Sequence, residues 1–88
     1  MTIEEQAEAR HRAYLAAHGG KDAWETWDAS RFVVEAQEEA ADGWQYTKQG
    51  QVRHINRHGE ESPLLDRAEV FFKLAWDALR QYQEAEDA

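Results

Sequence analysis

The sequence predicts a small, mainly helical α+β domain, in the order helix, short helix, helix, β-hairpin and long C-terminal helix. The chain has 88 residues and no cysteine, so residues 1–88 form one domain that no disulfide can stabilise. Capping residues and glycines stand where helices would begin and end. The strongest apolar periodicity lies after Pro63. An all-α small helical bundle is the alternative to the α+β fold.

The first helix is predicted to begin after Thr2 and to run to His18. Thr2 and Glu5 have the spacing of a capping box, and Gly19 and Gly20 end the helix. Its apolar stripe is thin, so this helix is expected to lie on the body of the domain. The following segment, KDAWETW, predicts a short helix that puts two tryptophans on one face.

The next helix is predicted from about Ala29 to Ala41, capped by Asp28 or Ser30 and ended by Gly43. Residues 44–59 contain fewer helix formers and more Trp, Tyr, Thr, Val and Ile, which favours a β-hairpin with its turn near residues 48–51. The alternation is imperfect, because the apolar residues at 52 and 55 are three apart. A helix over 51–58 therefore stays open.

The last helix is predicted to begin at Pro63, with Ser62 as its cap, and to run to about Glu84. The acidic tail at 84–88 is expected to fray. The helix carries two adjacent apolar stripes. One contains Leu64, Ala68, Phe71, Ala75, Ala78 and Tyr82, and the other contains Leu65, Phe72, Trp76 and Leu79. Two stripes exceed the usual apolar arc, so this helix either crosses the middle of the domain or presents a face to a partner.

The formal net charge of −8 disfavours binding to nucleic acids and anionic membranes, and it favours basic partners. The N-terminus lacks the basic and apolar regions of a signal peptide. No apolar run approaches the roughly 20 residues that span a bilayer. A cytoplasmic protein is expected.

Neither a metal nor an enzymatic activity is predicted. His54 and His58 are four apart, as two ligands on one helix face would be, but a site also needs a third ligand, which Glu60 or Glu61 would have to supply. The only serines, Ser30 and Ser62, are explained as helix caps, and no glycine-rich phosphate loop is present. No cofactor is expected.

The charge pattern is the most informative feature for function. Residues 44–59 contain no acid, and their basic side chains are Lys48, Arg53 and Arg57, with His54 and His58 between and beside them. Outside this basic segment, seven basic residues stand against eighteen acidic ones. Weak nucleic-acid contact through residues 44–59 is an alternative function, but three charges are few for it.

The opposite charge gathers on the preceding helix, in an acidic face of Glu35, Glu38, Glu39 and Asp42. Carboxylates displayed in this way can occupy a basic groove that would otherwise hold phosphates. The sequence therefore predicts a non-enzymatic interaction protein. Its most concrete form is a small acidic inhibitor of a nucleic-acid-handling complex, of the phage or mobile-element type and similar to anti-CRISPR proteins in physical class.

Self-association is the second hypothesis. A helical scaffold or homodimer would be held by surplus apolar side chains of the last helix, for which the candidates are Leu65, Phe72 and Trp76.

Overall fold

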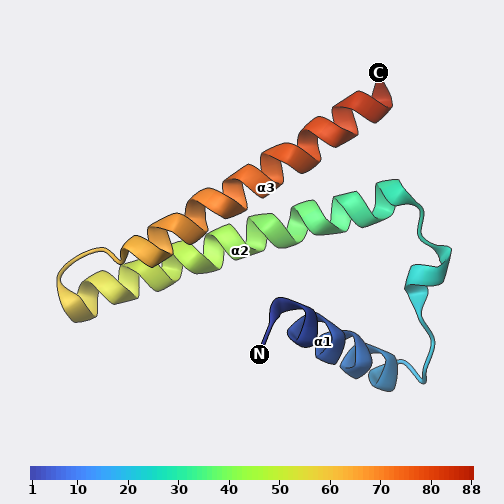
Figure 1. Cartoon of the computed structure of the whole chain (residues 1–88), viewed down its shortest axis with the longest axis horizontal. Helices are drawn as coiled ribbons and strands as arrows, with labels where there is room; N and C mark the ends of the chain where they lie inside the picture. Colours follow the sequence, from blue (N-terminus) through green and yellow to red (C-terminus); the bar gives the residue numbers. More distant parts are fainter.

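The computed structural model describes residues 1–88 as three α-helices and one short 3₁₀-helix, without a strand. The elements are α1 (Ile3–Ala17), η1 (Ala23–Thr26), α2 (Ala29–His58) and α3 (Pro63–Asp87). Helices α2 and α3 form a long antiparallel hairpin, and α1 lies on the other side of α2 from α3 (Figure 1). The all-α alternative is confirmed, and the predicted β-hairpin is wrong.

The helix starts follow from the predicted caps. The backbone N–H of Glu5 donates to Thr2 Oγ1, and the N–H of Thr2 donates to Glu5 Oε1, both at 3.1 Å. Asp28 caps α2, and Ser62 caps α3 with Pro63 in its first turn. Helix α2 ends at Gly59, which takes the left-handed conformation with φ +81°.

Residues 44–58, predicted as a hairpin, instead continue α2 without a break. Seven of the less exposed positions of α2 recur at alternating steps of four and three along the helix: Val33, Gln37, Ala40, Trp44, Thr47, Gln51 and His54. Such a heptad pattern is typical of two helices packed along their length. The two glycines inside α2 cost about 1 kcal/mol each in helix propensity, and packing against α3 outweighs that cost.

Gly43, predicted to stop a helix, is instead a packing residue inside one. A Cβ atom at this position would overlap the ring of Phe72 on α3, so the ring lies directly over the backbone of α2. Thr47, one turn later, donates its hydroxyl to the Gly43 carbonyl at 2.7 Å. The missing side chain lets the two helices approach closely at this point.

The Gln51 side chain links α2 to the start of α3 by hydrogen bonds. It is one of only two buried residues, with 6% of its surface exposed. Its amide nitrogen donates to the Ser62 carbonyl at 3.1 Å and to the Asp66 carboxylate at 2.9 Å, and its amide oxygen accepts from the Ser62 N–H at 2.9 Å. These three bonds satisfy the buried amide and fix where α3 begins relative to α2.

Helix α1 is linked to the hairpin by aromatic contacts through η1. The His11 ring stacks on Trp24, with centroids 4.2 Å apart, and lies 3.0 Å from the Asp22 carboxylate. Trp24 and Trp27 then contact Phe32 at the start of α2. No Cα of α1 comes within 8 Å of α2 or α3, so this aromatic chain is what positions α1.

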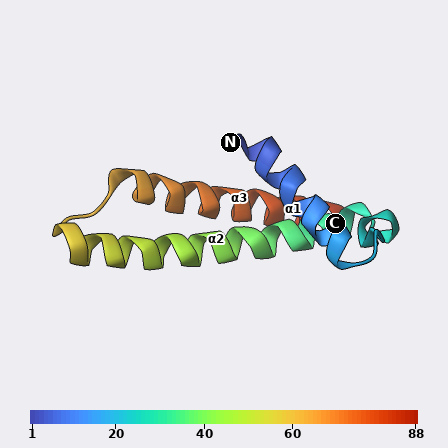
Figure 2. The same ribbon diagram turned by 90° about the horizontal axis from the view of Figure 1, so that it is seen from below.

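The molecule is open rather than compact (Figure 2). Its accessible surface is 7162 Å², whereas a compact monomer of this mass would expose about 5,300 Å². Its radius of gyration is 16.4 Å, against about 12 Å expected for a compact domain of this length. The excess surface is therefore roughly 1,800 Å². None of the helices combines the length and the apolar character that crossing a membrane requires.

We predict that Gln51→Ala lowers the free energy of unfolding by about 2 kcal/mol, because three hydrogen bonds at the hairpin turn are lost. Urea denaturation followed by circular dichroism measures the change. Gln45→Ala, an exposed glutamine of the same helix, is the matched control and should change stability by less than about 0.5 kcal/mol. Equal effects of the two substitutions would contradict the role of Gln51.

We predict opposite effects of alanine at the two glycines of α2. Gly43→Ala should destabilise the protein by about 1 kcal/mol, since displacing the Phe72 ring costs more than the gain in helix propensity. Gly50→Ala should stabilise it by about 1 kcal/mol, since a Cβ there meets no atom within 4 Å. The same denaturation measurement decides, and stabilisation by both substitutions would show that Phe72 does not pack on Gly43.

We predict that Trp24→Ala releases α1 and leaves the α2–α3 hairpin intact. Amide hydrogen exchange over residues 3–17 should accelerate, because the His11 ring loses its stacking partner, while exchange in α2 stays the same. Tyr46→Ala removes an aromatic side chain that is 75% exposed and is the control. Unchanged exchange in α1 after Trp24→Ala would mean that other contacts hold this helix.

Candidate functional site

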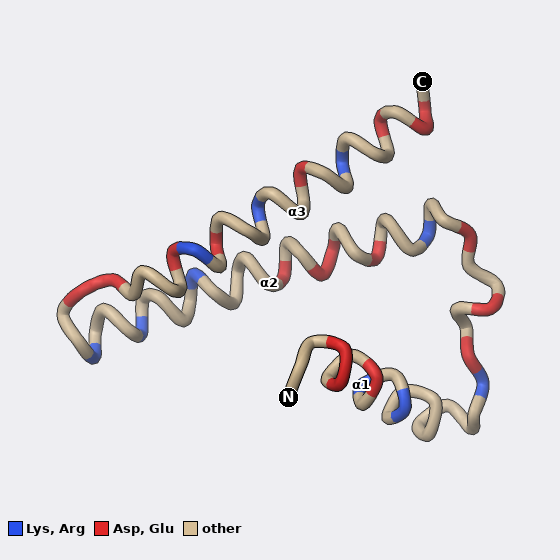
Figure 3. Tube along the Cα trace, viewed as in Figure 1, with Lys and Arg blue, Asp and Glu red and all other residues tan.

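The acidic face is a continuous strip on the outer side of α2. Glu35, Glu38, Glu39 and Asp42 are at positions i, i+3, i+4 and i+7, which share one face of a helix. The buried Ala40 belongs to the opposite side, against α3. Figure 3 shows these acids grouped in the first half of α2. The geometry thus brings together all four carboxylates predicted from the sequence.

Most of this charge is not neutralised within the molecule. Only Glu35 has an ion pair, with Arg31 Nε at 3.0 Å, and that pair is largely exposed. Glu38, Glu39 and Asp42 are exposed and make no ion pair. Three free carboxylates on one helix face are therefore available to a cation or a basic partner.

Helix α1 borders the acidic face. A cavity of about 580 Å³ separates α1 from the first half of α2, and Glu35 and Glu39 line it together with Arg10 and Tyr14 of α1. Trp24 of η1 and Trp27, which follows η1, also line this cavity. The position of α1 thus decides how far Glu35 and Glu39 are accessible, whereas Glu38 and Asp42 lie outside this cavity.

The basic segment is helical and its charges are divided between two sides of α2. Lys48 lies over the Trp44 ring, 4.4 Å from its centroid. Arg53, five residues later, is about 140° around the helix from Lys48, and Arg57 follows it by one turn. The structure therefore does not gather the three cations into one patch.

His54 and His58 are brought together at the end of α2, with ring centroids 4.4 Å apart. No third ligand completes this pair, since no group of three or more His, Cys, Asp or Glu is placed to hold a metal ion. The pair adds to the basic end of α2, next to the negative end of the helix dipole.

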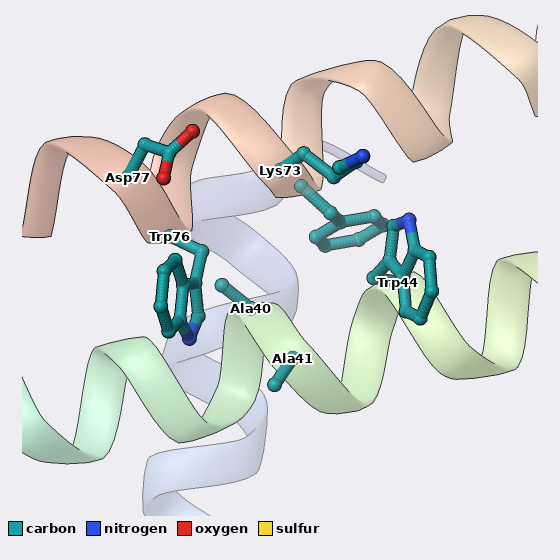
Figure 4. Close-up of a pocket in the computed structure, with 7 residues that line it drawn as sticks. Ala40, Ala41, Trp44, Lys73, Trp76 and Asp77 are labelled. Carbon is teal, nitrogen blue, oxygen red and sulfur yellow. The ribbon is translucent and has the colours of Figure 1, made fainter. Parts of the chain in front are cut away.

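The three apolar interface candidates occupy the contact between α2 and α3. Leu65 and Phe72 are half-buried there, and Trp76 lies at its edge with 37% of its surface exposed. Trp76 and Phe72 line an open groove of about 270 Å³, shown in Figure 4. The remaining lining residues are Ala40, Ala41, Trp44, Lys73 and Asp77.

This groove was not predicted, because Trp44 and Ala41 were assigned to different elements. With α2 continuous, the two are three apart and face the same side. The sequence signal that could have located this groove is the presence of one tryptophan on each of two antiparallel helices, Trp44 and Trp76. Its alanine floor and tryptophan walls suit one apolar side chain of a bound protein.

Comparison with known proteins gives no match, whether with family models, curated protein sequences or solved structures.

Proposed function

We propose that this protein is a non-enzymatic protein-interaction module that binds a basic surface of a nucleic-acid-handling protein. The observation that carries the proposal is the outward strip of carboxylates on α2, of which Glu38, Glu39 and Asp42 have no partner within the molecule. The open architecture supports it, because a chain with so little buried surface has more to gain from a partner than a compact domain has.

The spacing of the acidic face supports a basic groove as the target. The four carboxylates span seven helical steps, which is about 10 Å of rise, so successive charges are on average roughly 3.5 Å apart along the helix axis. One strand of duplex DNA carries a phosphate every 3.4 Å or so. A groove lined with Lys and Arg that accepts a phosphate strand would therefore meet a similar charge density on α2. By occupying such a groove, the protein would inhibit nucleic-acid binding.

We predict that the substitutions Glu35→Lys, Glu38→Lys and Glu39→Lys together weaken such binding at least about tenfold, since each reverses a charge facing the basic groove. Biolayer interferometry against a panel of purified proteins with basic nucleic-acid grooves measures the affinity. Raising the salt should weaken binding as well, because the Debye length falls from about 10 Å at 0.1 M to about 3 Å at 1 M.

The matched control carries the same change of net charge elsewhere, in Glu60→Lys, Glu61→Lys and Glu86→Lys. This variant should retain most of the affinity. Duplex DNA added in excess should compete with the native chain for the same groove. Binding that is indifferent to salt and to the charge of the acidic face would contradict the proposal.

A further inference from the structure

One flank of α3, its outer face, carries a second apolar stripe that is largely exposed. It consists of Leu64, Ala68, Phe71, Ala75, Ala78 and Tyr82, which alternate in steps of four and three. At the C-terminal end of this stripe, Tyr82 also lines a cavity with Ala29, Ser30 and Val34 of α2. Phe71 is 60% exposed, Leu64 70% and Tyr82 42%. Leu74, at the edge of this stripe, is 57% exposed. A heptad spacing on an exposed face is typical of a helix that packs against another helix along its length.

The register of the hairpin explains why this stripe points outward. Phe72 lies over Gly43, and Trp76 and Lys73 line the groove toward α2. Leu64 and Phe71 each precede an inward-facing residue, Leu65 or Phe72, and lie about 100° around α3 from it, on an exposed flank. Helix α1 cannot cover them, because it lies beyond α2 and has no Cα within 8 Å of α3 (Figure 1).

We propose that the outer face of α3 is the interface of a homodimer, in which α3 packs antiparallel against α3 of a second copy. The face lacks the negative charge that would oppose self-association of an acidic chain. Between Leu64 and Tyr82, nine positions of α3 on this side include no Asp or Glu, and only one is charged: Leu64, Arg67, Ala68, Phe71, Leu74, Ala75, Ala78, Gln81 and Tyr82. Two chains of net charge −8 repel each other least where they meet through such a face.

The face is also complementary to itself. In an antiparallel pair centred midway between Phe71 and Ala75, Phe71 of one copy meets Ala75 of the other, and Leu64 meets Tyr82. Each phenylalanine then fits against an alanine, and the large side chains pair at both ends. A twofold interface needs this property, since one surface must bind its own copy. A partner of unrelated sequence would not require this self-complementarity.

The open molecule has surface available for such an interface. Standard interfaces bury about 800 Å² on each partner, and this chain exposes roughly 1,800 Å² more than a compact monomer of its mass. Contact through α3 leaves the outer side of α2 free in both copies. The dimer would present two acidic faces, and a target with two basic grooves would then be bound with greater avidity.

Size-exclusion chromatography with light scattering on the purified full chain tests the proposal without any other partner. The expected mass across the micromolar range is twice the chain mass of 10.2 kDa. A mass of one chain at every concentration would overturn the dimer. It would leave the proposed binding of a basic partner untouched, because that proposal rests on α2.

Two variants locate the interface. Phe71→Glu and Ala78→Glu each place a carboxylate on the proposed face and should shift the mass to that of a monomer with unchanged helical circular dichroism. If the hairpin needs the dimer to fold, the expected result is instead a loss of helix that concentrated protein reverses. The matched control, Val52→Glu, alters an apolar side chain of α2 that is 51% exposed and should stay dimeric. A dimer that survives both α3 variants would overturn the assignment.

Single cysteines test the antiparallel arrangement cleanly, because the native chain has none. Near the centre of the pair, Leu74→Cys lies close to its own copy and should form a disulfide-linked dimer under mild oxidation. Leu64→Cys, near one end, should not, because it faces Tyr82 of the second copy. Equal cross-linking at both positions would indicate a parallel pair and would overturn the proposed geometry.

Discussion

The arrangement of this molecule depends on the three hydrogen bonds of the Gln51 side chain. Only two residues of the chain are buried. The hydrogen bonds of Gln51 at the closed end of the hairpin therefore contribute strongly to the position of α3 on α2. Gln51 reaches both polar groups of the Ser62 backbone and the Asp66 carboxylate. A shift of α3 along α2 would leave a buried amide without partners, which is unfavourable by more than the net value of the bonds themselves.

The register fixed at Gln51 determines the surfaces of the protein. It places the Phe72 ring over Gly43, several turns away from the hairpin turn. One apolar stripe of α3 is thereby used within the hairpin, and the stripe that contains Phe71 is left outside. On α2, the packing of Phe72 over Gly43 leaves Ala40 on the buried side and Glu38 on the exposed side. The acidic and apolar surfaces therefore lie on different helices, the first on the side of α2 away from α3 and the second on a flank of α3.

Local features of the fold could be predicted from the sequence, and features that depend on distant residues could not. Thr2 and Ser62 act as caps because cap chemistry involves only neighbouring residues. The sequence predicts a helix stop at Gly43, because a glycine that ends a helix and one that accommodates a ring are identical in sequence. Only Phe72, on the other helix, distinguishes them. A stop at Gly43 implies that the segment after it belongs to another element.

The same distinction between local features and features that depend on distant residues applies to the candidate surfaces. The spacing of Glu35, Glu38, Glu39 and Asp42 predicts a shared face on any helix, and the structure has that face. The sequence of α3 shows two apolar stripes but does not say which of them meets α2. That choice is made by the register at Gln51, so residues such as Leu65 and Phe72 lie within the hairpin rather than on its outside.

The most direct measurement of this register is the set of nuclear Overhauser effects between the Phe72 ring and α2. Strong effects from the Phe72 ring protons to the α-protons of Gly43, together with effects from the Gln51 side-chain amide to Ser62, are the result that the structure predicts. Effects from the Phe71 ring to α2, with none between Phe72 and Gly43, would contradict it. They would show that the other stripe of α3 faces inward.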